Sequence, residues 1–478
     1  MESFSLGSLT PARVLVGLWQ VAELERTGPL DPDVAATRLI AYADAGFGTF
    51  DMADHYGSAE LIAARARKER PHTLAFTKWC PAPGPMTPDV VRAGVEERLT
   101  RLGTPTIDLL QFHWWNFEHP AWLDALHELS ALRTEGLIRE LGVTNFDAAH
   151  LRVALSDGVP IVSNQVSFSL IDRRARGELL ELCRQTDTKL LAYGTLCGGF
   201  LTDRWLGASE PRAIPDWSGQ KYHRFIKTAG GWLALQTVLA AAKEVADRHG
   251  SSIANVATRW VLDHEHVGGV IIGARLGERE HREDTKKLFD LHLTDTDRAT
   301  LEDAFKDLSP IPGDCGDEYR KPPFLTASGD LSHHLEEMPS PYKATPMGRR
   351  PDRLRVSSGS VWEPLAGFSR AVRAGNRILV SGTTATHGAD KVVAPSDPGA
   401  QTTYILDKIL AAIRALGGTP DDVIRTRILL TDVNDWEPVS RAHGRVFGDI
   451  RPANTLVAVG DLVGSYRVEI EAEALVAP

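Results

Sequence analysis

The chain has 478 residues, of which 43% are hydrophobic and 24% charged, and its formal net charge is −10. This length exceeds one typical domain, so we expect two globular domains. The negative charge disfavours nucleic-acid binding, because such a surface repels a phosphate backbone. No stretch approaches the roughly 20 apolar residues of a membrane helix, and the four cysteines form no CxxC pair, as is typical of reduced intracellular proteins. We therefore expect a cytoplasmic enzyme that binds neither membrane nor nucleic acid.

Short apolar runs alternate with amphipathic helical stretches over the first 274 residues. Eight runs have strand character and are joined mostly through helices: 13–20, 49–53, 74–79, 107–113, 138–146, 161–168, 189–196 and 267–274. This alternation implies a parallel sheet, and eight such units predict an α/β fold, a closed (β/α)8 TIM barrel. An open doubly wound sheet would instead need a glycine-rich phosphate turn after the first strand, where the chain offers only Gly17. We interpret the aperiodic segment 197–231 as a loop that covers the barrel mouth.

The composition changes near residue 310, where Pro, Gly and charged residues become frequent. We assign residues 1–335 to the barrel and residues 336–353 to a linker. Residues 354–478 predict the order strand, strand, helix, strand, helix, strand, strand, which is typical of a smaller α+β domain. The last strand alternates apolar and acidic residues, so one of its faces is expected to be buried.

Four ionisable residues fall at or just after the ends of consecutive predicted strands: Asp51, Tyr56, Lys78 and His113. In a barrel those ends converge on one mouth. A tyrosine with a pKa near 10 is a poor acid, but a nearby ammonium lowers that pKa and a carboxylate orients the lysine. We therefore expect a proton-donating relay, in which His113 polarises or orients a carbonyl. Each residue alone has an ordinary structural explanation; the joint pattern indicates catalysis.

These segments resemble the aldo-keto reductase family over roughly residues 5–335. FDMADHYGSAE (50–60), FTKW (76–79) and LLQFHWW (109–115) are similar to the segments that carry the family's catalytic tetrad. GVTNF (142–146), SNQV (163–166), AYGTLCGGFL (192–201) and IIGARLGEREHRED (271–284) are similar to its cofactor-binding segments. The resemblance implies hydride transfer from a nicotinamide cofactor to a carbonyl-like carbon, with Tyr56 as general acid and no metal.

The resemblance also assigns cofactor contacts residue by residue. It implies that Thr144, Asn145 and Gln165 bind the carboxamide, that Tyr193 stacks under the nicotinamide ring, and that the backbone near Leu196, Gly198 and Leu201 holds the pyrophosphate. The adenosine phosphate would be held by Gly273, Arg275, Arg279, Glu283 and Asp284. Two arginines favour NADPH over NADH, because a guanidinium pairs with a 2′-phosphate. A solvated charged helix face would also explain this stretch. The tryptophans at the strand ends suggest a flat apolar substrate slot made by Trp19, Trp79 and Trp114.

Residues 354–478 look like the Rid (reactive intermediate deaminase, YjgF-type) family, whose domain is chorismate-mutase-like. The likeness lies in GNRILVSG (375–382), LLTDVNDW (429–436), RPANTLVAVGDL (451–462) and VEIEAEA (468–474). Active members form trimers with clefts between subunits, where an arginine clamps a carboxylate during enamine or imine hydrolysis. Asn454 stands at that arginine's position and Phe368 at the cleft tyrosine's, while Ser381 and Glu469 match polar cleft positions. Without the arginine, hydrolysis of amino-acid-derived enamines is doubtful, and a scaffold or altered-specificity role is at least as well supported.

The leading interpretation is an NADPH-dependent reductase of a small carbonyl or imine substrate, assembled as a homotrimer or hexamer through its Rid-like domain. Two alternatives stay open. One is a cofactor-binding redox sensor without fast turnover, and the other is a deaminase centred on the C-terminal domain.

Overall fold

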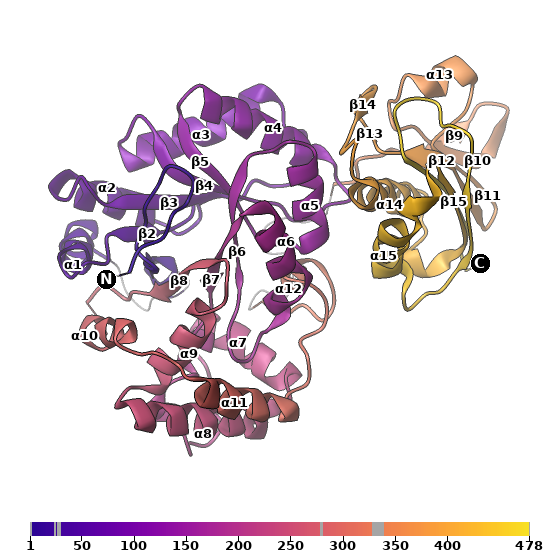
Figure 1. Cartoon of the computed structure of the whole chain (residues 1–478). Coiled ribbons are helices and arrows are strands. Elements are labelled where there is room, and N and C mark those ends of the chain that lie inside the picture. The colour runs from indigo at the N-terminus through magenta and orange to yellow at the C-terminus, as the bar shows by residue number, and fades with distance from the viewer. Residues whose placement is uncertain (1, 23–24, 26–29, 278–280, 327–338, 478) are drawn as a thin grey trace.

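The structure is a computed structural model of the chain, and it describes residues 2–22, 25, 30–277, 281–326 and 339–477 (Figure 1). Figure 1 shows a barrel, in indigo to red, beside a smaller domain in orange to yellow. Within the described residues, no helix combines the length and apolar character needed to cross a bilayer.

Eight parallel strands close the barrel in sequence order. They are β1 (Val14–Gly17), β2 (Thr49–Asp51), β3 (Leu74–Trp79), β4 (Ile107–His113), β5 (Ile138–Thr144), β6 (Ile161–Ser167), β7 (Lys189–Tyr193) and β8 (Val267–Gly273). Strand β1 pairs with β8 to complete the ring. Strand β4 is buried along its whole length, as expected for a strand covered on both faces. The predicted (β/α)8 fold is confirmed.

Helices surround the barrel: α1 (Pro32–Asp44), α2 (Ala59–Glu69), α3 (Pro88–Leu102), α4 (Ala121–Thr134), α5 (Ala148–Ser156), α6 (Glu178–Thr186), α7 (Trp217–Thr228), α8 (Gly231–His249), α9 (Ile253–Leu262), α10 (Arg282–Lys286), α11 (Asp295–Ala304) and α12 (Asp317–Arg320). Helix α3 shows how the sequence sets their limits: the Thr87 hydroxyl caps its start, and Gly103, at a φ of 59°, ends it. The segment 197–231 is not loop throughout, because α7 lies within it.

The second domain is a mixed seven-stranded sheet in the order β16-β15-β17-β12-β11-β10-β9. Its strands are β9 (Thr345–Met347), β10 (Arg350–Val356), β11 (Ala371–Ala374), β12 (Arg377–Thr384), β15 (Val423–Leu430), β16 (Ala453–Ala458) and β17 (Val468–Leu475). Three helices, α13 (Trp362–Ala366), α14 (Pro398–Ala415) and α15 (Trp436–Phe447), and the hairpin β13 (Thr386–His387) with β14 (Lys391–Val392) complete it. In β17 the apolar residues are buried, apart from Leu475 at its end, and the glutamates are half-buried, which confirms the predicted α+β layer.

The predicted linker over 336–353 is too long at its C-terminal end. Residues 345–347 form β9 and residues 350–353 begin β10, so both belong to the second sheet. Of the seven residues of β10, only Val356 is buried, so this outer strand has no apolar alternation from which it could be recognised. Residues 336–338 lie outside the described residues.

The two domains are in direct contact where α14 packs against α5 (Figure 1). Charged pairs cross this boundary: His150–Asp407 (3.1 Å), Arg152–Asp397 (2.6 Å), His387–Asp124 (2.6 Å), Lys391–Asp157 (3.2 Å), Arg414–Glu118 (2.8 Å) and Arg445–Glu178 (2.6 Å). Most of these pairs are partly exposed to solvent.

Candidate active site

The centre of the barrel mouth is a buried ion pair. Lys78 on β3 extends its Nζ to within 2.7 Å of Asp51 Oδ2 at the end of β2, and both side chains are at most 5% exposed. The same Nζ donates to the Met52 carbonyl (2.9 Å) and lies 5.1 Å from the centre of the Tyr56 ring. The barrel thus brings three of the four predicted catalytic side chains together, and His113 ends the neighbouring strand β4.

Two glutamines extend the network around Asp51. Gln111 and Gln165 both donate from Nε2 to Asp51 Oδ1, at 3.1 Å and 2.7 Å, and Gln165 also donates to Gln111 Oε1 (2.8 Å). Gln165 therefore holds the Asp51 carboxylate in place, in addition to its predicted contact with a cofactor. Gln111 was not predicted, although it lies two residues before His113 and so on the same inward face of β4.

Tyr56 is held protonated. Burial, and then the negative charge of Asp51, raise the pKa of Tyr56 well above its ordinary value. This corrects the expectation that Lys78 would lower it. The lysine charge is largely neutralised by Asp51, and Nζ lies near the ring rather than being hydrogen-bonded to the hydroxyl. A phenol with a raised pKa keeps its proton at neutral pH and gives it up only to a strongly basic atom.

His113 is neutral, and its geometry selects one tautomer. Burial, and then the charge of Arg320, lower the pKa of His113 well below its ordinary value. Its Nδ1 lies 3.3 Å from the Thr144 carbonyl oxygen, which can only accept, so we assign the proton to Nδ1. Nε2 then carries the lone pair, and it is buried with no hydrogen-bond partner in the described part of the chain.

The residues expected to hold a nicotinamide lie next to this centre. Asn145 follows β5 in a left-handed conformation (φ 58°), and its Oδ1 accepts from the Tyr193 hydroxyl (2.8 Å). The Thr144 hydroxyl donates to the Gln165 carbonyl (3.0 Å), so it also joins β5 to β6. Among the described residues, nothing accepts from Asn145 Nδ2 and nothing donates to Gln165 Oε1. One free donor and one free acceptor are what a primary carboxamide requires, so these residues fit the group.

The predicted phosphate-binding segments lie after β7 and β8. Between Leu196 and Leu201 the chain forms a tight turn in which Gly198 has a φ of 66°. A Cβ at Gly198 would meet the Tyr222 ring of α7 at 2.9 Å, which explains why a glycine is needed there. Gly273 is exposed at the end of β8, and Arg275 follows it.

The acidic residues predicted for the adenosine end already have protein partners. Glu283 pairs with Lys286 at 2.8 Å, and Asp284 accepts from the Ser252 hydroxyl at 2.9 Å, both from the short helix α10. Arg279 lies outside the described residues.

The three predicted substrate tryptophans occupy different positions. Trp19 lies edge-on to Tyr56, with ring centres 4.9 Å apart, and donates to Glu25 (2.7 Å). Trp79 lines a cavity of about 300 Å³ together with Trp115. Trp114 is fully buried and stacks on Phe112 behind β4, so its assignment to the substrate slot is wrong. Its neighbour Trp115 stands over His113 instead, with ring centres 4.3 Å apart.

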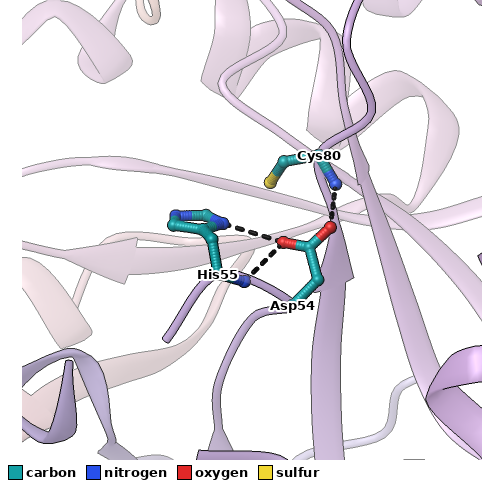
Figure 2. Close-up of side chains that lie close together, drawn as sticks. All are labelled: Asp54, His55 and Cys80. Carbon is teal, nitrogen blue, oxygen red and sulfur yellow. Dashed lines mark hydrogen bonds and ion pairs between the residues drawn. The ribbon is translucent and has the colours of Figure 1, made fainter. Parts of the chain in front are cut away.

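A hydrogen-bonded cluster fixes the loop that carries Tyr56. Figure 2 shows Asp54 between His55 and Cys80: Oδ1 accepts from the His55 backbone N–H and Nδ1 (both 2.8 Å), and Oδ2 accepts from the Cys80 N–H (2.8 Å). The potential ligand atoms of the three side chains lie within 4.8 Å of one another. Because both Asp54 oxygens are already satisfied, we interpret the cluster as a clamp that joins the loop after β2 to the end of β3.

Helix α12 (Asp317–Arg320), which was not predicted, covers the barrel mouth and is called the roof below. The Tyr319 hydroxyl accepts from Lys221 Nζ (2.7 Å), and its ring centre lies 5.8 Å from that of His113. Arg320 is half-buried and donates to the Asn145 carbonyl (2.7 Å) and the Trp114 carbonyl (2.6 Å). The roof thus contacts the residues that follow both β4 and β5. Only long-range contacts identify it, because four helical residues give no periodic signal.

The predicted Rid-like cleft residues are spread over the second sheet. Ser381 on β12 donates to the Ser369 carbonyl (2.9 Å), and Phe368 lies 5.6 Å from the guanidinium of Arg370, a buried residue that was not predicted. The Arg370 Nη1 donates to the Gly382 carbonyl (2.7 Å) and the Thr383 hydroxyl (2.6 Å). Glu469 is on β17, whereas Asn454 is exposed on the edge strand β16 and contacts His443 (3.4 Å). Strand β15 separates β16 from β17.

Comparison with protein families agrees with both halves of the molecule. The model of the aldo/keto reductase family matches residues 13–306, and that of the family described as endoribonuclease L-PSP matches residues 359–476. The chain therefore belongs to the aldo/keto reductase family of oxidoreductases and carries a second, Rid/YjgF-type domain.

Individual relatives resemble the barrel. The NADH-specific methylglyoxal reductase of Escherichia coli is 27% identical over 330 residues, which cover 63% of this chain and 97% of that protein. The solved glycerol dehydrogenase of Gluconobacter oxydans matches with a TM-score of 0.55 and 27% identity, over 65% of this chain and 97% of its own. Flagellar radial spoke protein 5 of Chlamydomonas reinhardtii is 34% identical over 191 residues, or 36% of each protein, so the match spans about a third of that relative.

Proposed function

We propose that this chain is a nicotinamide-dependent reductase that delivers hydride to the carbonyl carbon of a small molecule, with Tyr56 as proton donor. The observation that carries this proposal is the buried Asp51–Lys78 pair beside a protonated Tyr56, next to the free donor of Asn145 and the free acceptor of Gln165. When bound, the cofactor supplies the hydride, and the protein supplies binding, orientation and the proton.

The side chains divide this work between them. Tyr56 gives its proton to the substrate oxygen as negative charge develops there, and the fixed Lys78 ammonium stabilises the phenolate that results. Asp51 and the two glutamines keep that ammonium in place. Trp19 and Trp115 form apolar walls beside the reacting atoms, which excludes water and strengthens these electrostatic interactions.

We propose NADPH as the preferred cofactor and NADH as the weaker one. Arg275 lies two residues after the end of β8, where the adenosine phosphate is expected, and its guanidinium suits a 2′-phosphate. The E. coli relative is named an NADH-specific enzyme, so both cofactors belong in the test.

The tautomer of His113 favours an imine as a second substrate class. With the proton on Nδ1, the buried Nε2 is a hydrogen-bond acceptor, which cannot donate to a carbonyl oxygen. It can accept from a substrate that carries hydrogen on its reacting heteroatom, as a protonated imine does. This observation supports reduction of a C=N bond in the same mouth.

We also propose that the second domain joins three copies of the chain through the face of its sheet opposite α14. Leu379 is 50% exposed on this face, among cross-strand pairs such as Arg427 with Glu471 (3.0 Å). Such a mixed apolar and charged sheet face is suited to a partner surface.

One experiment tests the reductase. NADPH and NADH oxidation by the wild-type chain and by Tyr56→Phe is followed with aldehydes, ketones and freshly prepared cyclic imines. We expect oxidation that depends on Tyr56, and the preferred substrate decides between carbonyl and imine. If the wild-type chain binds cofactor and oxidises it with none of these compounds, the proposal is wrong.

A further inference from the structure

Arg445 of the second domain lies at the junction of two segments that shape the reductase mouth. From α15 its Nη1 donates to Glu178 (2.6 Å) and its Nη2 to Asp314 (2.5 Å), while Nη2 lies 3.6 Å from Asp147. Asp147 comes two residues after Asn145 and caps α5. Asp314 lies in the segment that leads into α12, and its backbone N–H donates to Asp317 (2.9 Å). One guanidinium therefore contacts both the loop after β5 (Asn145–Asp147), which is proposed to bind the nicotinamide, and the segment that leads into α12.

A second line of contacts runs from α14 to the same place. Asp407 binds His150 Nε2 (3.1 Å), and the Nδ1 of that histidine binds Asp147 (2.7 Å). The imidazole stacks on Phe117, with ring centres 3.7 Å apart and planes 8° apart. The guanidinium of Arg320 contacts the same ring, at 4.4 Å from its centre. Arg320 then donates to the carbonyls of Asn145 and Trp114.

The loop that receives these contacts needs external support. Asn145 has a φ of 58°, a left-handed conformation that is less favourable than the right-handed one for residues with a Cβ. Such a conformation persists only where the surroundings determine it. Here the Asn145 N–H donates to Gln165 (2.8 Å), and its carbonyl accepts from Arg320. The side chain of Asn145 keeps its free amide donor in the mouth only while this backbone geometry is held.

We propose that the second domain fixes the nicotinamide-binding loop of the barrel, with Arg445 and Asp407 as positioning residues for cofactor binding. This inference rests on the proposed nicotinamide cofactor. It predicts that the two domains are energetically coupled, so that breaking these contacts weakens cofactor binding at a site that neither residue touches.

Other charged pairs across the boundary provide a matched control. Arg152 on α5 binds Asp397 at 2.6 Å, and this aspartate caps α14. The pair joins an arginine to an aspartate, as Arg445 and Asp314 do, and it links α5 with α14, the two helices that His150 and Asp407 also link. Arg152 lies seven residues after Asn145, and within the described part of the chain its ion pair with Asp397 touches neither the loop after β5 nor α12. Loss of Arg152 therefore removes one docking contact between the domains and leaves the contacts of Arg445 and Asp407 in place.

The test measures NADPH and NADH dissociation constants by titration calorimetry on the full chain, for wild type, Arg445→Ala, Arg445→Lys, Asp407→Asn and Arg152→Ala. We expect Arg445→Ala to weaken cofactor binding roughly tenfold. The cofactor KM should rise equally while kcat changes less than about twofold. Arg445→Lys should recover part of the loss because it keeps the positive charge, and Arg152→Ala should bind like wild type.

Several outcomes would overturn the inference. If Arg445→Ala and Arg152→Ala weaken cofactor binding equally, the contacts of Arg445 only hold the two domains together. If neither variant weakens cofactor binding, the second domain does not fix the loop that contains Asn145. Should Arg445→Ala fail to fold, Asp314→Asn removes one of the same contacts from the barrel side and decides the question. If wild type binds neither nucleotide, the proposed function itself fails, which is a different result from unchanged binding in the variants.

Discussion

The barrel mouth and the sheet face of the Rid-like domain bring their polar side chains together in different ways. In the mouth, residues from β2 to β6 converge, so the Asp51 carboxylate accepts hydrogen bonds from Lys78, Gln111 and Gln165 of the same chain. On the open sheet, Asn454 sits on an edge strand apart from Glu469, and the Arg370 guanidinium is engaged by a backbone carbonyl and a hydroxyl. A closed barrel gathers its strand ends at one point, whereas an open sheet offers a surface that another surface must complete.

Tyr56→Phe has the largest expected effect, and it tests directly whether the barrel mouth is the reactive site. It removes the only atom proposed to give up a proton, so kcat should fall about 10²–10⁴-fold. Cofactor affinity should stay unchanged, since the phenol is not among the proposed cofactor contacts. Steady-state kinetics and calorimetry measure both, with Tyr42→Phe on the outer helix α1 as control. Retained activity would show that the mouth is not the reactive site.

Asp51→Asn should show how strongly the mouth depends on its buried pair. The substitution leaves the Lys78 ammonium buried without a full counter-charge, which should lower the free energy of unfolding by about 3–5 kcal/mol. Urea unfolding measures this change. As a control, Glu437→Gln breaks the exposed Arg441–Glu437 pair on α15 and should leave stability unaltered. Equal stabilities for the two variants would contradict the prediction.

The contribution of His150 to the free energy of unfolding should depend on pH. Burial opposes its charge, but the carboxylates of Asp147 and Asp407 outweigh burial and raise the pKa of His150 from 6.5 to about 9. A raised pKa stabilises the folded state fully below pH 6.5, and this contribution disappears as the pH rises through about 9. Wild type should therefore exceed His150→Gln by up to roughly 3 kcal/mol at pH 6 and converge with it at pH 10. Urea unfolding at both values checks this, and a pH-independent difference would refute it.

Leu379→Lys should change assembly with the smallest effect on catalysis. A lysine on the exposed sheet face would place three like charges in the proposed trimer contact, so sedimentation should show monomers. The rate per barrel should change less than about twofold, because the mouth is complete in one chain. Leu233→Lys, at a more exposed position on α8 of the barrel (80% against 50% for Leu379), is the control. An unchanged mass for Leu379→Lys would exclude this face as the interface.

Much of the barrel could be predicted from local pattern, because strand ends in a barrel meet whatever the sequence distance between them. That rule correctly brought together Asp51, Tyr56 and Lys78. Side-chain alternation within a strand accounts for two further residues. With His113 facing inward, the alternation of β4 places Gln111 on the same face and Trp114 on the opposite one, where it is buried behind the strand.

The parts of the site and fold that the sequence does not predict depend on contacts between residues far apart in the chain. Arg320 acts through two backbone carbonyls that are 175 and 206 residues away in sequence. The raised pKa of Tyr56 follows from burial depth and from how completely Asp51 neutralises Lys78, which only coordinates reveal. Strands β9 and β10 were missed because outer strands with mostly exposed side chains carry no apolar alternation.

The charged pairs between the domains have a consequence for behaviour in solution. Attractions between partly exposed charges are screened over about 8 Å at physiological ionic strength and over shorter distances at higher salt. Apolar contact between α5 and α14 is not weakened in this way. Added potassium chloride should therefore loosen the charged part of the boundary while the apolar part holds. Ionic strength thus adjusts the strength of the contact between the two domains without any change in the protein itself.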